Sequence, residues 1–225
     1  MADDVLIDQL ERAQGLGFLG PGPVVTHVDH SRGFAEGLDA PPARFLDLGS
    51  GGGVPGLVLA LDWPDAKAVL LDAGERRCAF LREAVSHLGL EDRVDVVRQR
   101  AEEAGRSPTL RGRFDLVVAR SFGPPPVTAE CASPFLRVGG RLVVSEPPSD
   151  SSTRPDLDPG DDSDTGDSPD PGTTPRWPPA ALAQLGLGPD VAWRTEYGYQ
   201  SLLQRTLCPA RYPRRVGQPA KRPLF

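Results

Sequence analysis

A glycine-rich run at residues 47–53, Asp-Leu-Gly-Ser-Gly-Gly-Gly, restricts the fold of this chain more than any other feature of its sequence. An apolar run at 44–48 leads into it, and an apolar stretch at 54–61, with Pro55 near its start, follows it. This order predicts a strand, a tight turn and a helix whose first turn contains the proline. Because glycine carries no Cβ, such a turn brings bare backbone N–H groups to the carboxyl end of a sheet. So many glycines are costly to order, which favours a binding loop over a ligand-free turn.

Strand-like and helix-like segments alternate along the chain as far as residue 144. Leu81, Ala84, Val85 and Leu88 repeat at helical spacing ahead of Gly89, a typical helix end. Alternating strands and helices imply right-handed crossovers, so we expect an α/β fold with a doubly wound, mostly parallel sheet. The expected strands are 44–48, 68–72, 94–97, 114–119 and 138–144, and a further helix is expected at 127–136.

Length and composition set limits on the class of protein. The 225 residues suit one α/β domain with additions. No apolar stretch approaches the ~20 residues that cross a bilayer, and the acidic N-terminus does not resemble a secretory signal. Cys78, Cys131 and Cys208 lie far apart without a Cys-x-x-Cys pair, so we expect reduced thiols. These features predict a cytoplasmic protein with neither a membrane segment nor a metal site.

Charge is distributed unevenly along the chain. Residues 147–175 contain eight aspartates and one arginine, so this segment has a net charge of −7. Because the whole chain has a net charge of −6, the remaining residues together are close to +1. The segment has almost no apolar residue and is expected to be disordered. The charged residues from 204 to 225 are all basic, which favours contact with nucleic acid. They are Arg205, Arg211, Arg214, Arg215, Lys221 and Arg222.

These patterns divide the chain into a sheet domain and three additions. A helix is expected at 2–13, a short helix at 180–185, and an antiparallel pair of strands at 190–197 and 199–207 that closes the sheet. The expected organisation is a short helical or irregular N-terminal region at 1–43, a domain at 44–146 and 176–210, an acidic disordered insert at 147–175, and a basic C-terminal tail at 211–225.

The glycine run is compatible with two nucleoside cofactors. Gly51, Gly53 and Gly56 satisfy the Gly-x-Gly-x-x-Gly fingerprint, so a nicotinamide dinucleotide is one candidate. Asp47 favours the other, S-adenosylmethionine, because its carboxylate is placed to meet the ammonium of the methionine moiety and would repel a pyrophosphate. We therefore expect S-adenosylmethionine to bind at Gly49, Gly51 and Gly53.

Further candidate residues follow the next three predicted strands at the same edge. Asp72, 19 residues after Gly53, is placed to accept hydrogen bonds from a ribose diol. Ala101 and Glu102 lie where the adenine ring binds in such sites, although acids there are equally typical of an exposed first helical turn. Arg120 is placed to hold a cofactor carboxylate or an RNA phosphate, the alternative being a surface ion pair.

Taken together, these motifs resemble the small-subunit ribosomal RNA guanine-N7 methyltransferases, also called glucose-inhibited division protein B. The resemblance covers residues 45–144 and 199–224. It rests on Leu-Asp-Leu-Gly-Ser-Gly-Gly-Gly-Val-Pro-Gly at 46–56, Leu71-Asp72 with Arg76-Arg77 and Phe80-Leu81, Arg100-Ala101-Glu102-Glu103, Ala119-Arg120, and the ending Tyr-Pro-Arg-Arg-Val-Gly-Gln-Pro-Ala-Lys-Arg-Pro-Leu at 212–224.

The resemblance implies a class I S-adenosylmethionine-dependent methyltransferase with a Rossmann-like fold. It implies that Gly49 and Val54 contact the cofactor, that Ala101 and Glu102 contact its adenosine end, and that Arg120 contacts the cofactor or the target nucleotide. The implied reaction is methyl transfer to N7 of a guanine in small-subunit ribosomal RNA, with the basic tail touching the small ribosomal subunit. Guanine N7 carries a lone pair and no proton, so alignment in a dry pocket is sufficient and no catalytic residue is assigned.

Two regions depart from the family pattern. Only 43 residues precede Arg44, whereas the family usually has a longer N-terminal helical region with an Asn-Leu-Thr stretch. Ser145-Glu146 stands where the family often has Lys-Gly, and the acidic insert that follows would repel phosphates. Two alternatives therefore stay open: a diverged methyltransferase acting on a small molecule or protein, and a non-catalytic RNA- or ribosome-binding module.

Overall fold

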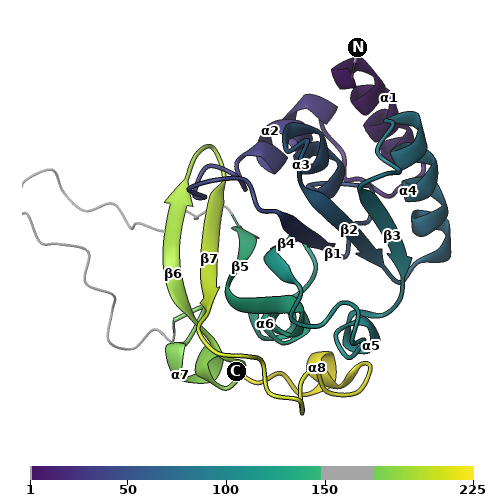
Figure 1. Ribbon diagram of the computed structural model, residues 1–225. Helices are drawn as coiled ribbons and strands as arrows, with labels where there is room; N and C mark the ends of the chain where they lie inside the picture. Colours follow the sequence, from purple (N-terminus) through teal and green to yellow (C-terminus); the bar gives the residue numbers. More distant parts are fainter. Residues whose placement is uncertain (1, 148–174) are drawn as a thin grey trace, which may run out of the picture.

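The strands form a seven-stranded sheet with the order β3-β2-β1-β4-β5-β7-β6 (Figure 1). The structure is a computed structural model that describes residues 2–147 and 175–225. The five strands from β3 to β5 run parallel, and β7 is antiparallel to its neighbours β5 and β6. The predicted disorder of 147–175 lies outside the described residues except at its two ends. The strands are β1 (Arg44–Leu48), β2 (Lys67–Asp72), β3 (Val94–Arg98), β4 (Phe114–Ala119), β5 (Leu136–Glu146), β6 (Leu187–Arg194) and β7 (Gly198–Gln204).

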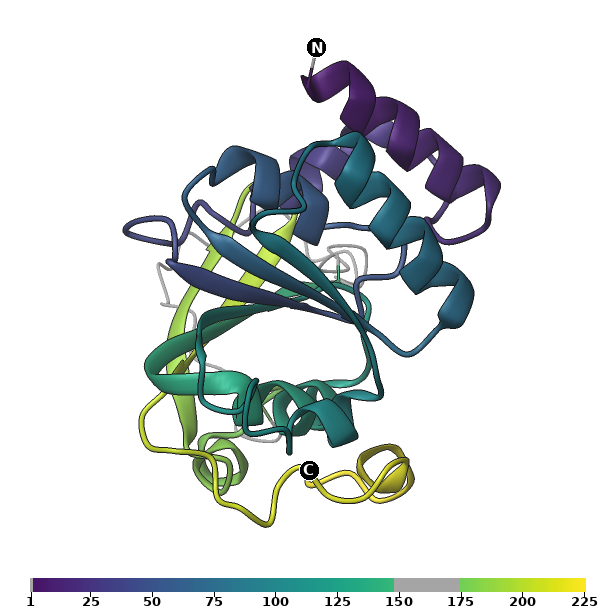
Figure 2. The ribbon, with the colours of Figure 1, turned by 45° about the vertical axis from the view of Figure 1, so that its right-hand side comes forward.

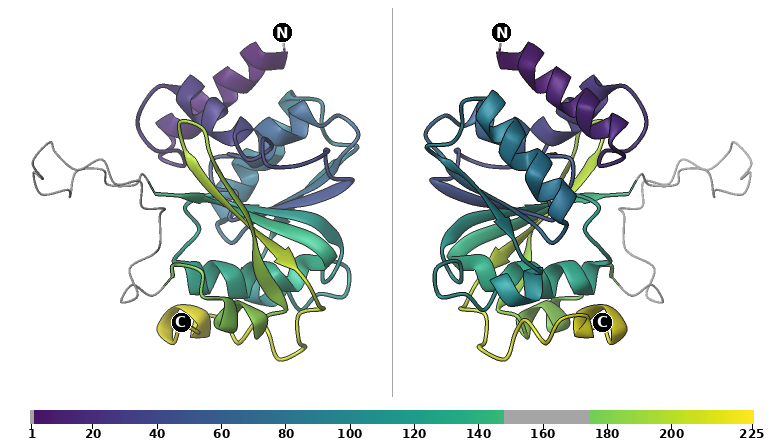
Figure 3. Two further views of the ribbon diagram at one scale, coloured as in Figure 1. Left: turned by 90° about the vertical axis from the view of Figure 1, so that its left-hand side faces the viewer. Right: turned by 90° about the vertical axis from the view of Figure 1, so that its right-hand side faces the viewer.

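Helices cover both faces of the sheet (Figures 2 and 3). Leu10, Leu57 and Leu81 belong to the hydrophobic cluster on one face, and Ala132 and Leu182 belong to the cluster on the other. Because both faces are covered, the central strands β1 and β4 are buried along almost their whole length. The first face carries α1 (Ala2–Gly15), α2 (Val24–Arg32), α3 (Gly56–Asp62) and α4 (Glu75–His87); the second carries α5 (Ala101–Ala104), α6 (Pro125–Ala132), α7 (Pro179–Ala183) and α8 (Gln218–Lys221). Among the described helices, none has the length and apolar character needed to cross a bilayer.

The structure confirms the parallel, doubly wound sheet, and it corrects several boundaries. The first four predicted strands are right to within one residue. The helix expected at 127–136 ends at Ala132, a 3-10 turn (Ser133–Phe135) follows, and β5 already begins at Leu136. Pro55 precedes α3 instead of lying in its first turn, and the Val54–Pro55 peptide bond is cis. Helix α2 has no counterpart in the predicted elements.

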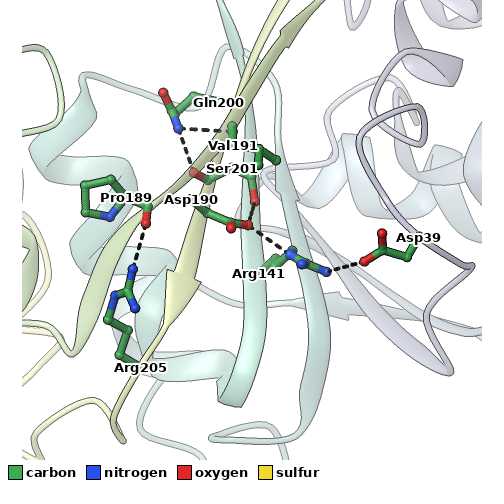
Figure 4. Close-up of polar contacts among 8 residues, drawn as sticks. All are labelled: Asp39, Arg141, Pro189, Asp190, Val191, Gln200, Ser201 and Arg205. Atoms are coloured by element: carbon green, nitrogen blue, oxygen red, sulfur yellow. Dashed lines mark hydrogen bonds and ion pairs between the residues drawn. The ribbon is translucent and has the colours of Figure 1, made fainter.

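A polar network ties the three strands at the antiparallel edge together, as Figure 4 shows. Asp190 of β6 accepts hydrogen bonds from Arg141 Nε of β5, at 2.9 Å, and from Ser201 Oγ of β7, at 2.8 Å. Asp190 lies at a register irregularity that begins after Pro189, whose carbonyl accepts a hydrogen bond from Arg205. The predicted closing hairpin is present, although both of its strands end three residues earlier than expected. The Asp190 carboxylate links its two strands to β5 in addition to the backbone pairing of β5 with β7.

The C-terminal tail, residues 211–225, lies against the domain. Arg111 donates hydrogen bonds to the carbonyl oxygens of Cys208 and Tyr212, at 2.7 and 2.8 Å. Arg214 forms an ion pair with Glu130 of α6, whose side chain is fully buried, and the Arg214 backbone N–H also donates to that carboxylate. Part of the positive charge of the tail therefore serves contacts inside the protein.

Replacing Arg214 by alanine is expected to destabilise the fold strongly, because it removes the guanidinium that pairs with the buried Glu130 carboxylate. Breaking such a pair costs about 3 kcal/mol or more, which corresponds to a fall in Tm of about 6–12 °C for a chain of this size. Arg215→Ala, at the exposed neighbouring position, is the matched control and should change stability by less than about 0.5 kcal/mol. Equal melting curves for the two variants would contradict the assignment.

Candidate functional site

A cavity of about 770 Å³ opens at the carboxyl ends of the central parallel strands. Its size falls in the range of pockets that bind small molecules and cofactors. The wall consists of the glycine loop after β1, the ends of β2, β3 and β4, a loop between α1 and α2, and part of the C-terminal tail. Seven of the eight predicted site residues line it: Gly49, Gly51, Val54, Asp72, Ala101, Glu102 and Arg120.

The glycine loop explains why the eighth residue, Gly53, does not face the cavity. Gly51 and Gly53 both have left-handed backbone angles, with φ of 54° and 92°. A Cβ at Gly53 would meet Leu57 Cδ1 at 2.4 Å, so this glycine is required by the packing of the turn onto α3. A Cβ at Gly51 would lie 3.6 Å from Phe18 O, an ordinary van der Waals contact, so packing does not require glycine there and its bare backbone lines the cavity. Glycine spacing alone could not separate these two roles.

Asp72 is fixed at the cavity wall by donors from two loops. One carboxylate oxygen accepts hydrogen bonds from Gly74 N at 2.7 Å and Arg77 Nε at 2.9 Å, and the other accepts from Gly51 N at 3.0 Å. A carboxylate offers about four acceptor sites, so a position stays open on the oxygen bound to Gly51. Asp72 therefore both anchors the glycine loop and keeps capacity for a ligand hydroxyl.

Asp47 does not occupy the position inferred from the sequence, and its interpretation as the partner of a ligand ammonium is wrong. Its side chain is 1% exposed, it is not part of the cavity wall, and Oδ2 accepts a hydrogen bond from Gly56 N at 3.0 Å. A Cβ at Gly56 would lie 2.5 Å from the same oxygen, which accounts for glycine there. Burial raises the pKa of Asp47 to about 7, and the nearby Asp72 carboxylate adds to the shift.

Ala101 and Glu102 begin α5 and face the cavity, but Glu102 also has an internal partner. Its Oε1 accepts a hydrogen bond from Gly217 N of the C-terminal tail at 2.9 Å, and Glu102 is largely buried. The alternative of an exposed helical acid is therefore excluded for Glu102, whereas Glu103 is exposed. This contact holds the tail at the cavity, and the tail residues Gly217 and Ala220 form part of the cavity wall.

Arg120 has a donor that no described residue uses. Its Nη2 lies 2.7 Å from His27 Nδ1, while His27 Nε2 lies 3.1 Å from the carbonyl oxygen of Gly20. A carbonyl only accepts, so His27 carries its proton on Nε2 and Nδ1 accepts from Arg120. Burial, followed by the charge of Arg120, lowers the pKa of His27, which keeps this ring neutral. Arg120 Nη1 is buried without a hydrogen-bond partner among the described residues, which disfavours a surface ion pair and leaves one guanidinium donor unused in a residue that lines the cavity.

Sequence reasoning missed the loop between α1 and α2. Phe18 packs edge-on against Phe80 of α4, with ring centroids 5.9 Å apart, and Arg76 lies over the Phe18 ring. The Phe18 carbonyl would meet a Cβ at Gly52 at 2.9 Å, so this loop lies directly on the glycine loop. Its glycine- and proline-rich composition indicated irregular structure and gave no sign of this position. The described residues contain no group of histidine, cysteine or acidic side chains suited to a metal ion.

Comparison with known proteins identifies the family. The model of the family described as rRNA small subunit methyltransferase G matches residues 24–147. The chain belongs to this family. It is 38% identical over 184 residues to the Ribosomal RNA small subunit methyltransferase G of Prochlorococcus marinus strain MIT 9313, covering 81% of this chain and 68% of that protein. It is 34% identical over 195 residues to the protein of the same name from Moorella thermoacetica, covering 83% and 72%.

A solved structure has the same fold as this chain. The crystal structure of a putative O-methyltransferase from Klebsiella pneumoniae aligns with a TM-score of 0.57, covering 90% of this chain and 88% of that chain. At 16% sequence identity the likeness shows the fold alone. The family and the fold together bear out the class I, Rossmann-like methyltransferase architecture expected from the sequence.

Substituting Asp47 by asparagine is expected to change how stability depends on pH. The pKa of Asp47 is higher in the folded chain than its ordinary value of 3.8. The protonated side chain therefore contributes its full stabilisation of the fold below pH 3.8, and this contribution is lost as the pH rises toward about 7. Asparagine stays neutral, so D47N should gain stability over the native chain across this interval, by a few kcal/mol at about 1.4 kcal/mol per pH unit. Thermal melts from pH 4 to 8 measure the difference. Asp95→Asn, at an exposed position, should leave the profile unchanged. A pH-independent difference between D47N and the native chain would contradict the buried-acid assignment.

Proposed function

We propose that this chain transfers a methyl group from S-adenosylmethionine to N7 of a guanine in small-subunit ribosomal RNA. The chain belongs to the rRNA small subunit methyltransferase G family. The observation that carries the proposal is that its cavity is lined by the glycine loop, by Asp72 and by Arg120, which has an unpartnered donor. Such a substrate is met in the cytoplasm, the compartment expected from the sequence.

The residues of the cavity fit S-adenosylmethionine. Gly51 offers a backbone without Cβ, Asp72 keeps an acceptor site for a ribose hydroxyl, and Arg120 Nη1 suits a carboxylate. Gly49 and Val54 would contact the methionine end, and Ala101 and Glu102 would contact the adenosine end. Gly53 would contribute to cofactor binding indirectly, because it allows the tight turn that positions the glycine loop. When bound, the cofactor supplies an electrophilic methyl group on a sulfonium sulfur.

The proposed chemistry needs alignment more than proton transfer. Guanine N7 carries a lone pair and no proton, so no side chain has to act as a general base. The task of this chain is to hold the acceptor in line with the methyl group and to keep water out. The Phe18 loop on one side and the tail residues Gly217 and Ala220 on another narrow the cavity for this purpose.

Mapping 7-methylguanosine in small-subunit ribosomal RNA tests the reaction. RNA from cells that lack the gene should miss one modification, and the purified chain should restore it on small subunits from those cells. An unchanged map, together with S-adenosylmethionine binding, would favour a methyltransferase acting on a small molecule or protein. An unchanged map without cofactor binding would favour a non-catalytic RNA- or ribosome-binding module.

Gly51→Arg is expected to weaken cofactor binding strongly without unfolding the protein. The side chain would enter the cavity, and we expect the Kd for S-adenosylmethionine to rise on the order of 100-fold, about 2.7 kcal/mol. Gly112→Arg is a matched control because Gly112 has a similar φ of 66° and open space around it but does not line the cavity. Isothermal calorimetry and melting curves measure both variants. Equal loss of binding in the two would attribute the effect to backbone strain.

The exposed basic residues of the tail are proposed to contact RNA phosphates. Lys221 and Arg222 are exposed, unlike Arg214. Replacing both by alanine should lower the slope of log K against log salt for small-subunit RNA by about 1 per charge and should leave cofactor affinity unchanged. Lys67 and Arg113, exposed at the amino ends of β2 and β4, provide the matched double-alanine control. A slope that changes equally in both double variants would exclude a specific role for the tail.

A further inference from the structure

A second cavity, of about 310 Å³, adjoins the proposed cofactor site. The two share Ser121, Phe122 and Gly123, which form the loop after β4. On its other side the second cavity is lined by Glu146, at the end of β5, and by Trp177, before α7. A ligand in this cavity would therefore lie next to whatever occupies the first one.

Glu146 is held in a fixed position in this cavity. Its Oε1 accepts a hydrogen bond from Trp177 Nε1 at 2.6 Å, and its Oε2 forms an ion pair with Arg176 Nε. The side chain is 18% exposed. A carboxylate offers two acceptor positions on each oxygen, so each oxygen keeps one position that no residue in the described part of the chain occupies. The carboxylate is thus ready to receive two neighbouring donors side by side.

Two adjacent N–H donors are the Watson–Crick signature of guanine. Its N1–H and N2–H groups point in the same direction, whereas adenine and cytosine pair one donor with one acceptor and uracil has a single N–H between two carbonyls. We propose, building on the proposed function, that Glu146 binds the N1–H and N2–H edge of the acceptor guanine and selects it among the four bases. The family often has lysine and glycine at this point, so this recognition is inferred for this chain from its own residues.

The rest of the cavity suits a base taken out of its stack. Phe122 and Trp177 supply aromatic surface, a common support for an extruded base. His30, which also lines the cavity, stacks on Tyr197 with ring centroids 4.0 Å apart, and its buried Nε2 has no hydrogen-bond partner among the described residues.

The carboxylate would also favour the chemical step. The N7 lone pair forms the new bond to carbon while the carbon–sulfur electron pair goes to sulfur, so the sulfonium becomes a neutral thioether and the base becomes a cation. No proton is transferred. The positive charge that develops on the guanine makes N1–H and N2–H stronger donors, and an anion at that edge stabilises the product-like state more than the reactant.

Glu146→Gln tests the proposal, because an amide presents an N–H₂ group where the carboxylate accepts. Small subunits are reconstituted with RNA that carries either guanine or inosine, which lacks the N2 amino group, at the mapped position. The native chain should prefer guanine by about 10-fold or more in kcat/KM, and E146Q should lose most of both the rate and this preference. The Kd for S-adenosylmethionine should stay within about twofold. Glu11→Gln, at an exposed position on α1, is the matched control.

The outcomes separate this inference from the function on which it depends. If the native chain methylates neither RNA, the proposed function fails and the inference falls with it. If the native chain methylates guanine and E146Q retains its full preference over inosine, Glu146 is a structural partner of Trp177 and Arg176, and the inference is overturned. A preference that collapses while cofactor affinity is kept supports recognition by the carboxylate.

Discussion

The site depends on two buried carboxylates that hold one glycine loop. Asp47 accepts the Gly56 N–H beneath the loop, and Asp72 accepts the Gly51 N–H at its edge. Each is largely shielded from water, so each needs these donors to offset the cost of burial. The repulsion between the two acids, added to burial, favours a protonated Asp47. The loop is thereby fixed with its bare backbone toward the cavity, and of the two acids only Asp72 lines that cavity.

The C-terminal tail completes the site from a distance in sequence. Glu130 and Glu102 lie on or near the second sheet face and bind Arg214 and Gly217 of the tail. Because Glu130 is fully buried, its ion pair makes the position of the tail part of the stability of the fold. Basic composition alone could not separate the arginine used internally from Lys221 and Arg222, which stay exposed.

Much of the fold follows from the sequence because the central strands are buried on both faces and therefore read as continuous apolar runs. Helix α2 was missed because His27 and Ser31 occupy two of its buried positions, where the pattern would require apolar residues. The boundary between α6 and β5 was misplaced because the 3-10 turn at Ser133–Phe135 follows neither the helical nor the strand periodicity of apolar residues. The site residues after the strands lie at the cavity as expected, but the side on which Asp47 points depends on strand register, which the sequence does not reveal.

The loop after β4 joins the two cavities and carries the clearest local strain. Ser121 has a φ of 53° although it is not glycine, and such conformations persist where the surroundings hold them. Its neighbour Phe122 packs so closely on Gly49 that a Cβ there would lie 2.6 Å from the ring. The same ring borders the cavity of Glu146. A ligand in the first cavity and a base in the second would therefore both contact this loop. Ser121 and Phe122, rather than any titrating group, would then set the distance between methyl donor and acceptor.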